Sequence, residues 1–224
     1  MEAPGLYDSG RARIAALVGA LPDADLGRPV PSTPGWTVKD LVGHLAGVAS
    51  DLTSGRVDAA GSPAWTARQV HERRSLPLRA VLDEWASVAA SLGVAMASAP
   101  TPVWRCLVCD MACHEHDLRG ALQRPGARHT DAVDFARQAG VGLVHTRLRR
   151  AGTGGLRVVA GATEWFIGPG DPTATLSVEP FELFRLLYGR RSRPQIAALA
   201  WSGDPTAYVD HLALLEPATT DLTE

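Results

Sequence analysis

The sequence is poor in lysine and has no excess of positive charge. Its basic residues are 21 arginines and the single Lys39, and the formal net charge is −2 at pH 7. Binding to nucleic-acid phosphates needs a clustered basic excess, so this composition argues against a nucleic-acid partner. No uninterrupted apolar run reaches the roughly 18 to 20 residues of a membrane span, so no membrane partner is expected either.

The amino terminus, MEAPGLYDSGRAR, lacks the features of a secretion signal. Glu2 and Asp8 precede every basic residue, and no apolar core precedes a small-residue cleavage site. This predicts a cytoplasmic protein. The scarcity of lysine beside abundant Arg, Ala, Gly and Pro is typical of a GC-rich genome.

Cysteine is also scarce. Cys106, Cys109 and Cys113 are the only three, and they fall within eight residues. An odd number of cysteines so close together, in a chain without a secretion signal, argues against a disulfide framework. We expect reduced thiols that act as ligands or as packing groups.

The first half of the chain has helical periodicity. Apolar residues recur at helical spacing in four segments, 5–22, 37–52, 77–98 and 103–122. Thr37 is a good N-cap for the second segment, and Asp40 completes a capping box. The stretches after residues 22 and 52 are rich in Pro and Gly or polar, and we expect them to be connections. Four helices in this length predict a four-helix bundle over residues 1–126.

The second half, residues 127–224, contains sheet. A helix at 131–150 is followed by GLRVVAG, TEWFIGPG and ATLSVEP, which have the composition of strands and hairpins. A helix then begins at Pro180 and stops at Gly189, and two short helices flank the turn SGDP. The expected fold class is α+β, with an N-terminal bundle and a smaller mixed α/β C-terminal domain.

A chelating group can be assembled from two helices. Asp110 and His114 are four residues apart, so they lie on one helix face and can hold the same ion. His44 lies on the apolar stripe that should face the bundle interior, where it could meet this pair. Three protein ligands with an open fourth position are typical of catalytic zinc, whereas structural sites usually have four ligands.

Other interpretations compete with this one. A histidine on an apolar stripe is more often a hydrogen-bonded core residue than a ligand. Asp-x-x-x-His is common on solvated faces, and His116 and Asp117 are expected to cap the helix or to face water. The cysteines resemble small apolar filler, with Cys106 and Cys113 the nearer to the site because they flank Asp110.

Three segments carry a family resemblance. VPSTPGWTVKDLVGHLAGVASDL and DMACHEHDLRGAL resemble the actinobacterial mycothiol-dependent maleylpyruvate isomerase family, and PFELFRLLYGRRSRPQIAALAWSGDP resembles its second domain. The resemblance covers nearly the whole chain and implies a DinB-like metal-binding bundle. In the family, a histidine from the Pro-Gly-Trp-Thr helix and a Glu-x-x-x-His pair bind zinc; by motif these ligands fall on His44, Asp110 and His114. Asp110 is one methylene shorter than the family's glutamate.

The resemblance also implies a reaction. Zinc, or another divalent metal such as nickel or iron, would activate mycothiol as an external thiol for attack on a small electrophile. The outcome is either isomerisation or S-transfer. The family's second domain supplies an arginine that holds the substrate, and Arg185, Arg190 and Arg191 are the candidates, although a GRRSR turn can simply be solvated. We expect the protein to be a monomer or a homodimer.

Two alternatives remain open. One is a non-catalytic zinc-binding or small-ligand-binding regulatory protein in which the cysteines complete the coordination shell. The other is a bundle that has lost metal through the change at Asp110 and binds a small apolar ligand.

Overall fold

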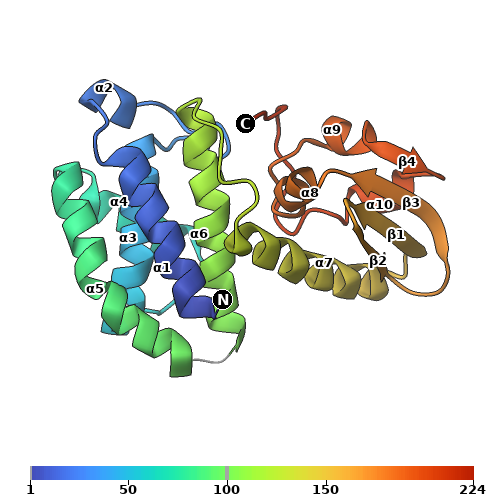
Figure 1. Ribbon diagram of the computed structural model, residues 1–224, viewed down its shortest axis with the longest axis horizontal. Coiled ribbons are helices and arrows are strands. Elements are labelled where there is room, and N and C mark those ends of the chain that lie inside the picture. Colours follow the sequence, from blue (N-terminus) through green and yellow to red (C-terminus); the bar gives the residue numbers. More distant parts are fainter. Residues whose placement is uncertain (1, 99–100) are drawn as a thin grey trace. The chain divides into compact units, whose positions relative to one another are not determined.

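The computed structural model describes residues 2–98 and 101–224, without the side chains of residues 98, 101 and 102. The chain divides into two compact units, Met1–Gly126 together with Glu224, and Ala127–Thr223. The first unit is helical and the second combines helices with a small sheet (Figure 1). The predicted α+β class is therefore confirmed.

The first unit is built around four long helices. Helices α1 and α3 each pack against α5, and each also contacts α6, so the four enclose one core; their bounds are α1 Ala3–Val18, α3 Val38–Ser54, α5 Leu78–Ser98 and α6 Thr101–Ala121. The fully buried side chains of Ile14, Leu41, Trp85 and Leu118 come one from each helix. The predicted four-helix bundle is confirmed, and each helix begins within about three residues of its expected start.

The start of α3 is fixed by local hydrogen bonds. The Thr37 hydroxyl accepts a bond from the Asp40 backbone N–H (3.2 Å), and the Asp40 carboxylate accepts one from the Thr37 N–H (3.1 Å). This is the predicted capping box, and it satisfies amides that the first helical turn leaves unpaired.

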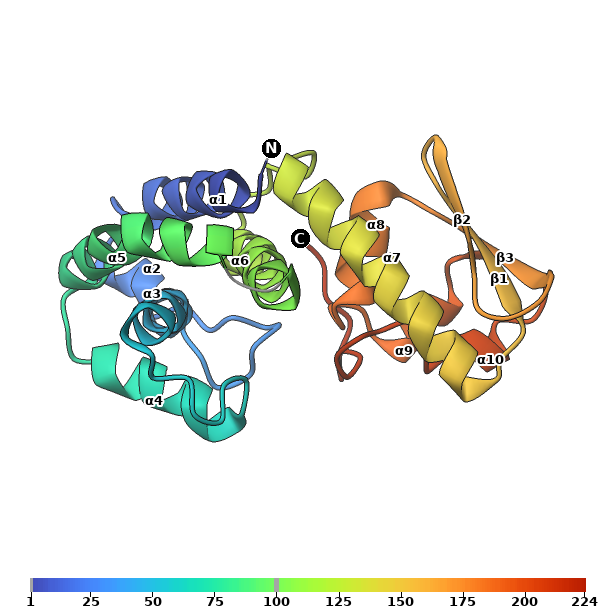
Figure 2. The same cartoon turned by 90° about the horizontal axis from the view of Figure 1, so that it is seen from below.

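Two helices lie in stretches that we expected to be connections. They are the short α2 (Asp23–Leu26) and the longer α4 (Pro63–Arg73), which begins with Ser62 as its cap. Helix α4 packs on α3, on the side that faces away from α1 (Figure 2). Its buried face carries Gln69 and Arg73, and these polar side chains interrupt the apolar periodicity that would have revealed the helix.

Helix α5 is the one helix of the described residues that is long and apolar enough to cross a membrane, judged by length and composition alone. The core helix of a bundle passes the same test, so this is weak evidence for a span. Val81, Trp85, Leu92 and Met96 of α5 are buried in the bundle.

The second unit opens with α7 (Asp131–Ala151), which packs against α8 (Pro180–Leu187) and the sheet. The sheet has the order β2-β1-β3-β4, in which β1 pairs antiparallel with β2 and parallel with β3. The strand bounds are β1 Gly155–Ala160, β2 Thr163–Ile167, β3 Pro172–Val178 and β4 Ala200–Ser202. A two-residue turn with Gly161 at φ +60° joins β1 to β2.

The end of the chain carries the two expected short helices, α9 (Arg193–Ala197) and α10 (Thr206–Val209). Between them lies β4, which the sequence did not predict and which pairs antiparallel with β3. With only three residues, β4 is too short to show an alternating pattern.

Gly47 allows α4 to approach α3. A Cβ atom at this position would lie 2.6 Å from Cβ of Gln69, closer than packed atoms approach. We predict that Gly47→Ala lowers the free energy of unfolding by about 1–3 kcal/mol, because the helices must separate. The control is Gly93→Ala in α5, where the nearest atom is 4.0 Å away; it should be neutral or stabilise by up to about 1 kcal/mol. Chemical denaturation followed by tryptophan fluorescence measures both, and equal effects would contradict the prediction.

Candidate metal centre

Three donor groups converge inside the first unit. His44 comes from α3, and Asp110 and His114 come from successive turns of α6. Nε2 of His44 lies 3.6 Å from Oδ2 of Asp110, and Nε2 of His114 lies 3.3 Å from Oδ1. One donor atom from each of the three lies within 4.8 Å of the others. The structure thus brings together the three residues that the sequence analysis selected.

Both imidazole rings are oriented by hydrogen bonds at Nδ1, the nitrogen that does not face Asp110. Nδ1 of His114 lies 2.8 Å from the carboxylate of Asp117, and Nδ1 of His44 lies 2.8 Å from the amide oxygen of Gln69. Because each partner accepts a hydrogen bond, each Nδ1 carries the proton. In the neutral rings the Nε2 lone pairs therefore point toward Asp110, which is the orientation of metal-binding histidines.

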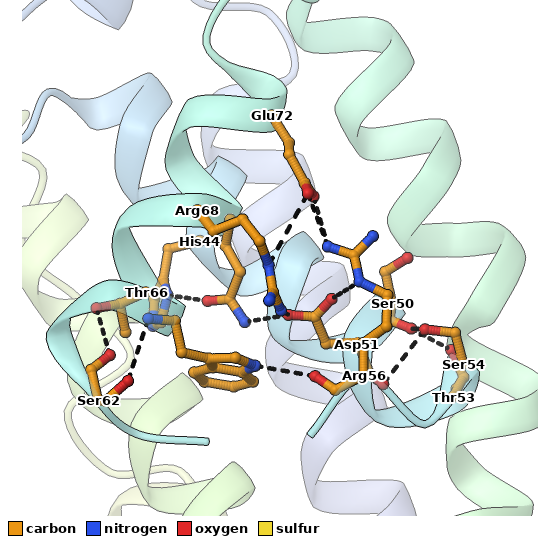
Figure 3. A network of polar contacts seen from close by, with 12 residues as sticks. His44, Ser50, Asp51, Thr53, Ser54, Arg56, Ser62, Thr66, Arg68 and Glu72 are labelled. Atoms are coloured by element: carbon orange, nitrogen blue, oxygen red, sulfur yellow. Dashed lines mark hydrogen bonds and ion pairs between the residues drawn. The ribbon is translucent and has the colours of Figure 1, made fainter. Parts of the chain in front are cut away.

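The Gln69 amide is itself oriented by a buried carboxylate. Its Nε2 donates to Oδ2 of Asp51 (2.9 Å), so the amide oxygen must face His44. Asp51 also accepts bonds from Arg56 (3.1 Å) and Arg68 (3.0 Å), which balance its charge in a site where its side chain is 1% exposed (Figure 3). A continuous chain of hydrogen bonds therefore runs from these two arginines to His44.

The protonation states follow from the charges in the cluster. Burial opposes ionisation of Asp110, but the charges and hydrogen bonds of His114 and His44 outweigh it and hold the pKa of Asp110 well below its ordinary value. Burial alone would lower the pKa of His114, but the Asp110 charge and the bonds to Asp110 and Asp117 raise it to about 9. Without an ion, the cluster is thus a carboxylate paired with an imidazolium.

The donor set fits a divalent ion. Two ligands on one tetrahedral zinc ion are separated by roughly 3.3 Å, because each metal–ligand bond is about 2 Å long. Nε2 of His114 lies 3.3 Å from Oδ1 of Asp110 and Nε2 of His44 lies 3.6 Å from Oδ2, each near this spacing, and one donor atom from each of the three residues lies within 4.8 Å of the others. Two imidazoles and one carboxylate suit zinc, nickel or iron, and three protein ligands leave a fourth position open.

A pocket opens from the donor groups. Its volume is about 800 Å³, within the range of small-molecule sites, and His44, Asp110 and His114 form part of its wall. Most of the remaining wall is aromatic or aliphatic and comes from α3, α4, α6 and the loop before α3, including Trp36, Val48, Leu52, Trp65, Val103 and Leu107. An external molecule at the fourth position would therefore lie against an apolar surface.

The cysteines lie outside the donor cluster. Cys106 is exposed and lines the pocket, as we expected, whereas Cys109 and Cys113 are buried. Within the described chain, the group of His, Cys, Asp and Glu donors contains no cysteine, and Cys113 does not line the pocket. Of the two cysteines expected to be nearer the site, Cys106 therefore lines the pocket and Cys113 does not.

The expectation for His116 and Asp117 was wrong. Both side chains are buried, with 1% and 2% of the residue surface exposed. Asp117 follows His114 by three residues on α6, so its carboxylate can reach the ring that the helix places beside it. The spacing within the sequence could have revealed this pair.

The three candidate arginines belong to the second unit, and they are buried rather than solvated. The guanidinium of Arg185 lies 5.9 Å from the centre of the Phe184 ring, and Arg190 donates to the Tyr188 carbonyl (2.7 Å). Arg191 binds both carboxylate oxygens of Glu182. The proposed role of these arginines in holding a substrate stays a prediction.

Sequence reasoning missed the groups that support His44. Gln69 lies on the helix that was not predicted, and Asp51 is at the end of α3, where an acidic residue is ordinarily solvated. Trp65 was missed for the same reason as Gln69. No local pattern connects Asp51 and Gln69 to His44, because the contact depends on how α4 packs against α3.

Comparisons with known proteins support the predicted resemblance. Residues 7–115 match the mycothiol maleylpyruvate isomerase N-terminal domain. The crystal structure of a histidine-to-alanine mutant of the mycothiol-dependent maleylpyruvate isomerase matches with a TM-score of 0.59 and 15% identity, covering 84% of this chain and 88% of that chain. The crystal structure of the mycothiol-dependent maleylpyruvate isomerase gives 0.54 and 16% over the same shares. These structural neighbours are enzymes, and at such identities they establish the fold. No curated protein matches the chain significantly.

We predict that Gln69 sets the metal affinity through His44. Gln69→Leu removes the acceptor for Nδ1 and should weaken zinc binding by roughly 10- to 100-fold, the usual effect of losing such a support. Thr66→Ala on the same helix is the control, because the Thr66 hydroxyl bonds only to nearby backbone carbonyls. Competition with a chromogenic chelator gives both affinities, and unchanged binding by Gln69→Leu would show that the hydrogen bond does not support the ligand.

We further predict that an ion displaces a proton from the site. The pKa of His114 is raised to about 9, so at pH 7 the metal-free ring is charged and must lose the proton on Nε2 to bind an ion. Zinc affinity should therefore rise by roughly tenfold per pH unit between pH 7 and 9. Calorimetry at pH 7 in buffers of different ionisation enthalpy measures the proton release. Heats that do not depend on the buffer would mean that His114 is already neutral.

Proposed function

We propose that this chain, whose N-terminal unit matches the mycothiol maleylpyruvate isomerase N-terminal domain, is a divalent-metal enzyme that uses mycothiol to attack a small electrophile. The observation that carries the proposal is the cluster of His44, Asp110 and His114 at the wall of an apolar pocket. Zinc is the metal that we favour, since the donors and their spacing suit it. We place the protein in the cytoplasm.

A divalent ion held by these residues would lower the pKa of a thiol bound at its open position and would so supply a thiolate nucleophile at neutral pH. The chain's own residues perform the other tasks. His44, Asp110 and His114 would hold the ion, and Gln69 and Asp117 keep the two rings in the binding tautomer. The apolar wall excludes water from the nucleophile and receives the substrate.

The same nucleophile can give two outcomes. With a cis-unsaturated acid, the thiolate sulfur adds to one alkene carbon, the double bond becomes a single bond that rotates, and expulsion of the thiolate restores the alkene as the trans isomer. With a substrate that carries a leaving group, the new C–S bond persists. The first outcome is an isomerase and the second is an S-transferase. Arg185, Arg190 and Arg191 are our candidates for holding a substrate carboxylate or enolate in the first case.

The alternative of a regulatory zinc protein needs a closed coordination shell. Cysteines would be the fourth ligands, but the donor group found among the described residues contains none. The pocket beside the donors also gives an external ligand access to the ion, which is typical of catalytic zinc sites and not of structural ones. These two observations favour the enzyme.

We predict that metal and turnover depend on His44 and not on a protein thiol. The wild type should bind about one zinc ion per chain and consume mycothiol with a small electrophile. His44→Ala should lose both the ion and turnover, because it removes one of three ligands. Cys106→Ser should keep the ion and change turnover by less than about threefold, since the serine is nearly isosteric. Elemental analysis and a thiol-consumption assay on the same samples decide. Wild type that stays metal-free after reconstitution with zinc rules out the proposal.

A further inference from the structure

The pocket beside the donor cluster has a definite chemical character. The larger apolar side chains of the wall are two indoles, Trp36 and Trp65, and four aliphatic groups, Val48, Leu52, Val103 and Leu107; Pro34, Ala60, Pro63 and Ala67 add smaller apolar surface. The lining comes from three helices and from the loops before α3 and α4, so several segments contribute to the apolar surface. A ligand is stabilised there chiefly by burial of its own apolar surface.

The pocket offers few partners for a polar ligand. Apart from the three donor residues, its polar side chains are Thr33, Thr66 and Cys106. The Thr66 hydroxyl already donates to the carbonyls of Ser62 and Pro63 in its own helix. No arginine or lysine appears among the lining residues of the described chain. A carboxylate that entered this space would lose its hydration, and the nearest positive charge, the His114 imidazolium, is already paired with Asp110.

The volume supports a ligand larger than a short-chain acid. At about 800 Å³, the pocket is toward the upper end of small-molecule sites. An aromatic ring or a branched alkyl group in this pocket could contact Trp36 and Trp65, and the donor cluster belongs to the same wall. The indole rings also favour offset or edge contacts with an aromatic ligand.

We propose that this pocket binds the uncharged apolar body of the electrophile, aryl or alkyl, and that the enzyme is an S-transferase for such compounds. This inference rests on the proposed function for its reaction but on the pocket alone for its binding preference. In the reaction, the sulfur lone pair of the thiolate forms a bond to the electrophilic carbon. The bond from that carbon to its leaving group breaks, and the leaving group departs with the electron pair. The thiol proton passes to solvent, so a thiol and an alkyl halide give a thioether, a proton and a halide ion.

Two ligands of matched size test the binding preference. 4-Nitrotoluene is neutral, whereas 4-nitrobenzoate carries a carboxylate on the same ring. In metal-free protein, equilibrium dialysis should give an affinity at least about tenfold higher for 4-nitrotoluene, because burying the carboxylate without a partner is unfavourable. Equal affinities, or tighter binding of 4-nitrobenzoate, would overturn the inference.

A pair of valine variants locates the binding. Val103 lines the pocket and is 43% exposed, so Val103→Arg can be accommodated while it places a charge at the apolar wall. It should weaken 4-nitrotoluene binding by about tenfold. It should also lower the ratio of the affinity for 4-nitrotoluene to the affinity for 4-nitrobenzoate. Val94→Arg is the matched control, since Val94 is 74% exposed on α5 and does not belong to the pocket wall. If the two variants bind alike, the ligand does not occupy this pocket and the inference fails.

Turnover separates this inference from the proposed function. Zinc-loaded protein with mycothiol should convert 4-nitrobenzyl chloride faster than maleylpyruvate, and Val103→Arg should lower the first rate by about tenfold. Conversion of maleylpyruvate alone would overturn the inference and leave the proposed function intact. If neither compound consumes thiol, the proposed function and the transferase reaction both fail, and the dialysis result for metal-free protein still decides what the pocket binds.

Discussion

The contact between one carboxylate and two imidazole rings organises the candidate site. Asp110 faces Nε2 of His114 from the same helix and Nε2 of His44 from α3, so a single side chain joins two elements of the bundle. The two rings can both direct Nε2 toward Asp110 only if each carries a proton on Nδ1. The hydrogen bonds from Nδ1 to Asp117 and to Gln69 fix that proton and the orientation of each ring.

The two supports differ in charge. Nδ1 of His114 bonds to a carboxylate, that of Asp117. Nδ1 of His44 bonds to the neutral amide of Gln69, and the carboxylate of Asp51 is the next member of that hydrogen-bond chain. A carboxylate hydrogen-bonded at Nδ1 makes the imidazole a more basic metal ligand than an amide does. Helix α4 supplies that amide and also the Trp65 side of the pocket wall. A ligand that displaces α4 would therefore disturb His44 before it disturbs His114.

Much of the fold could be predicted from periodicity, and the limits of that method are physical. The four bundle helices were recognised because apolar residues such as Ile14, Leu41 and Trp85 recur on one face of each. Helix α4 was missed because Gln69 is buried for its hydrogen bonds rather than for its hydrophobicity. The three ligands could be selected because Asp110 and His114 share a helix face and the family motif indicates His44. Asp117 could also be selected from its spacing to His114. Gln69 and Asp51 could not, since their contacts with the site arise from packing between segments.

The placement of the donors on two helices has a consequence for the bundle as a whole. His44 and Asp110 are separated by about half of the first unit, including the whole of α4 and α5. An ion that bound both would join the two ends of this long loop in the folded protein, and it would stabilise that state because the unfolded chain does not hold the ligands together. The loop also contains Gln69 and Trp65. Metal loading would thus add to the stability of the bundle at the same place where it completes the catalytic group.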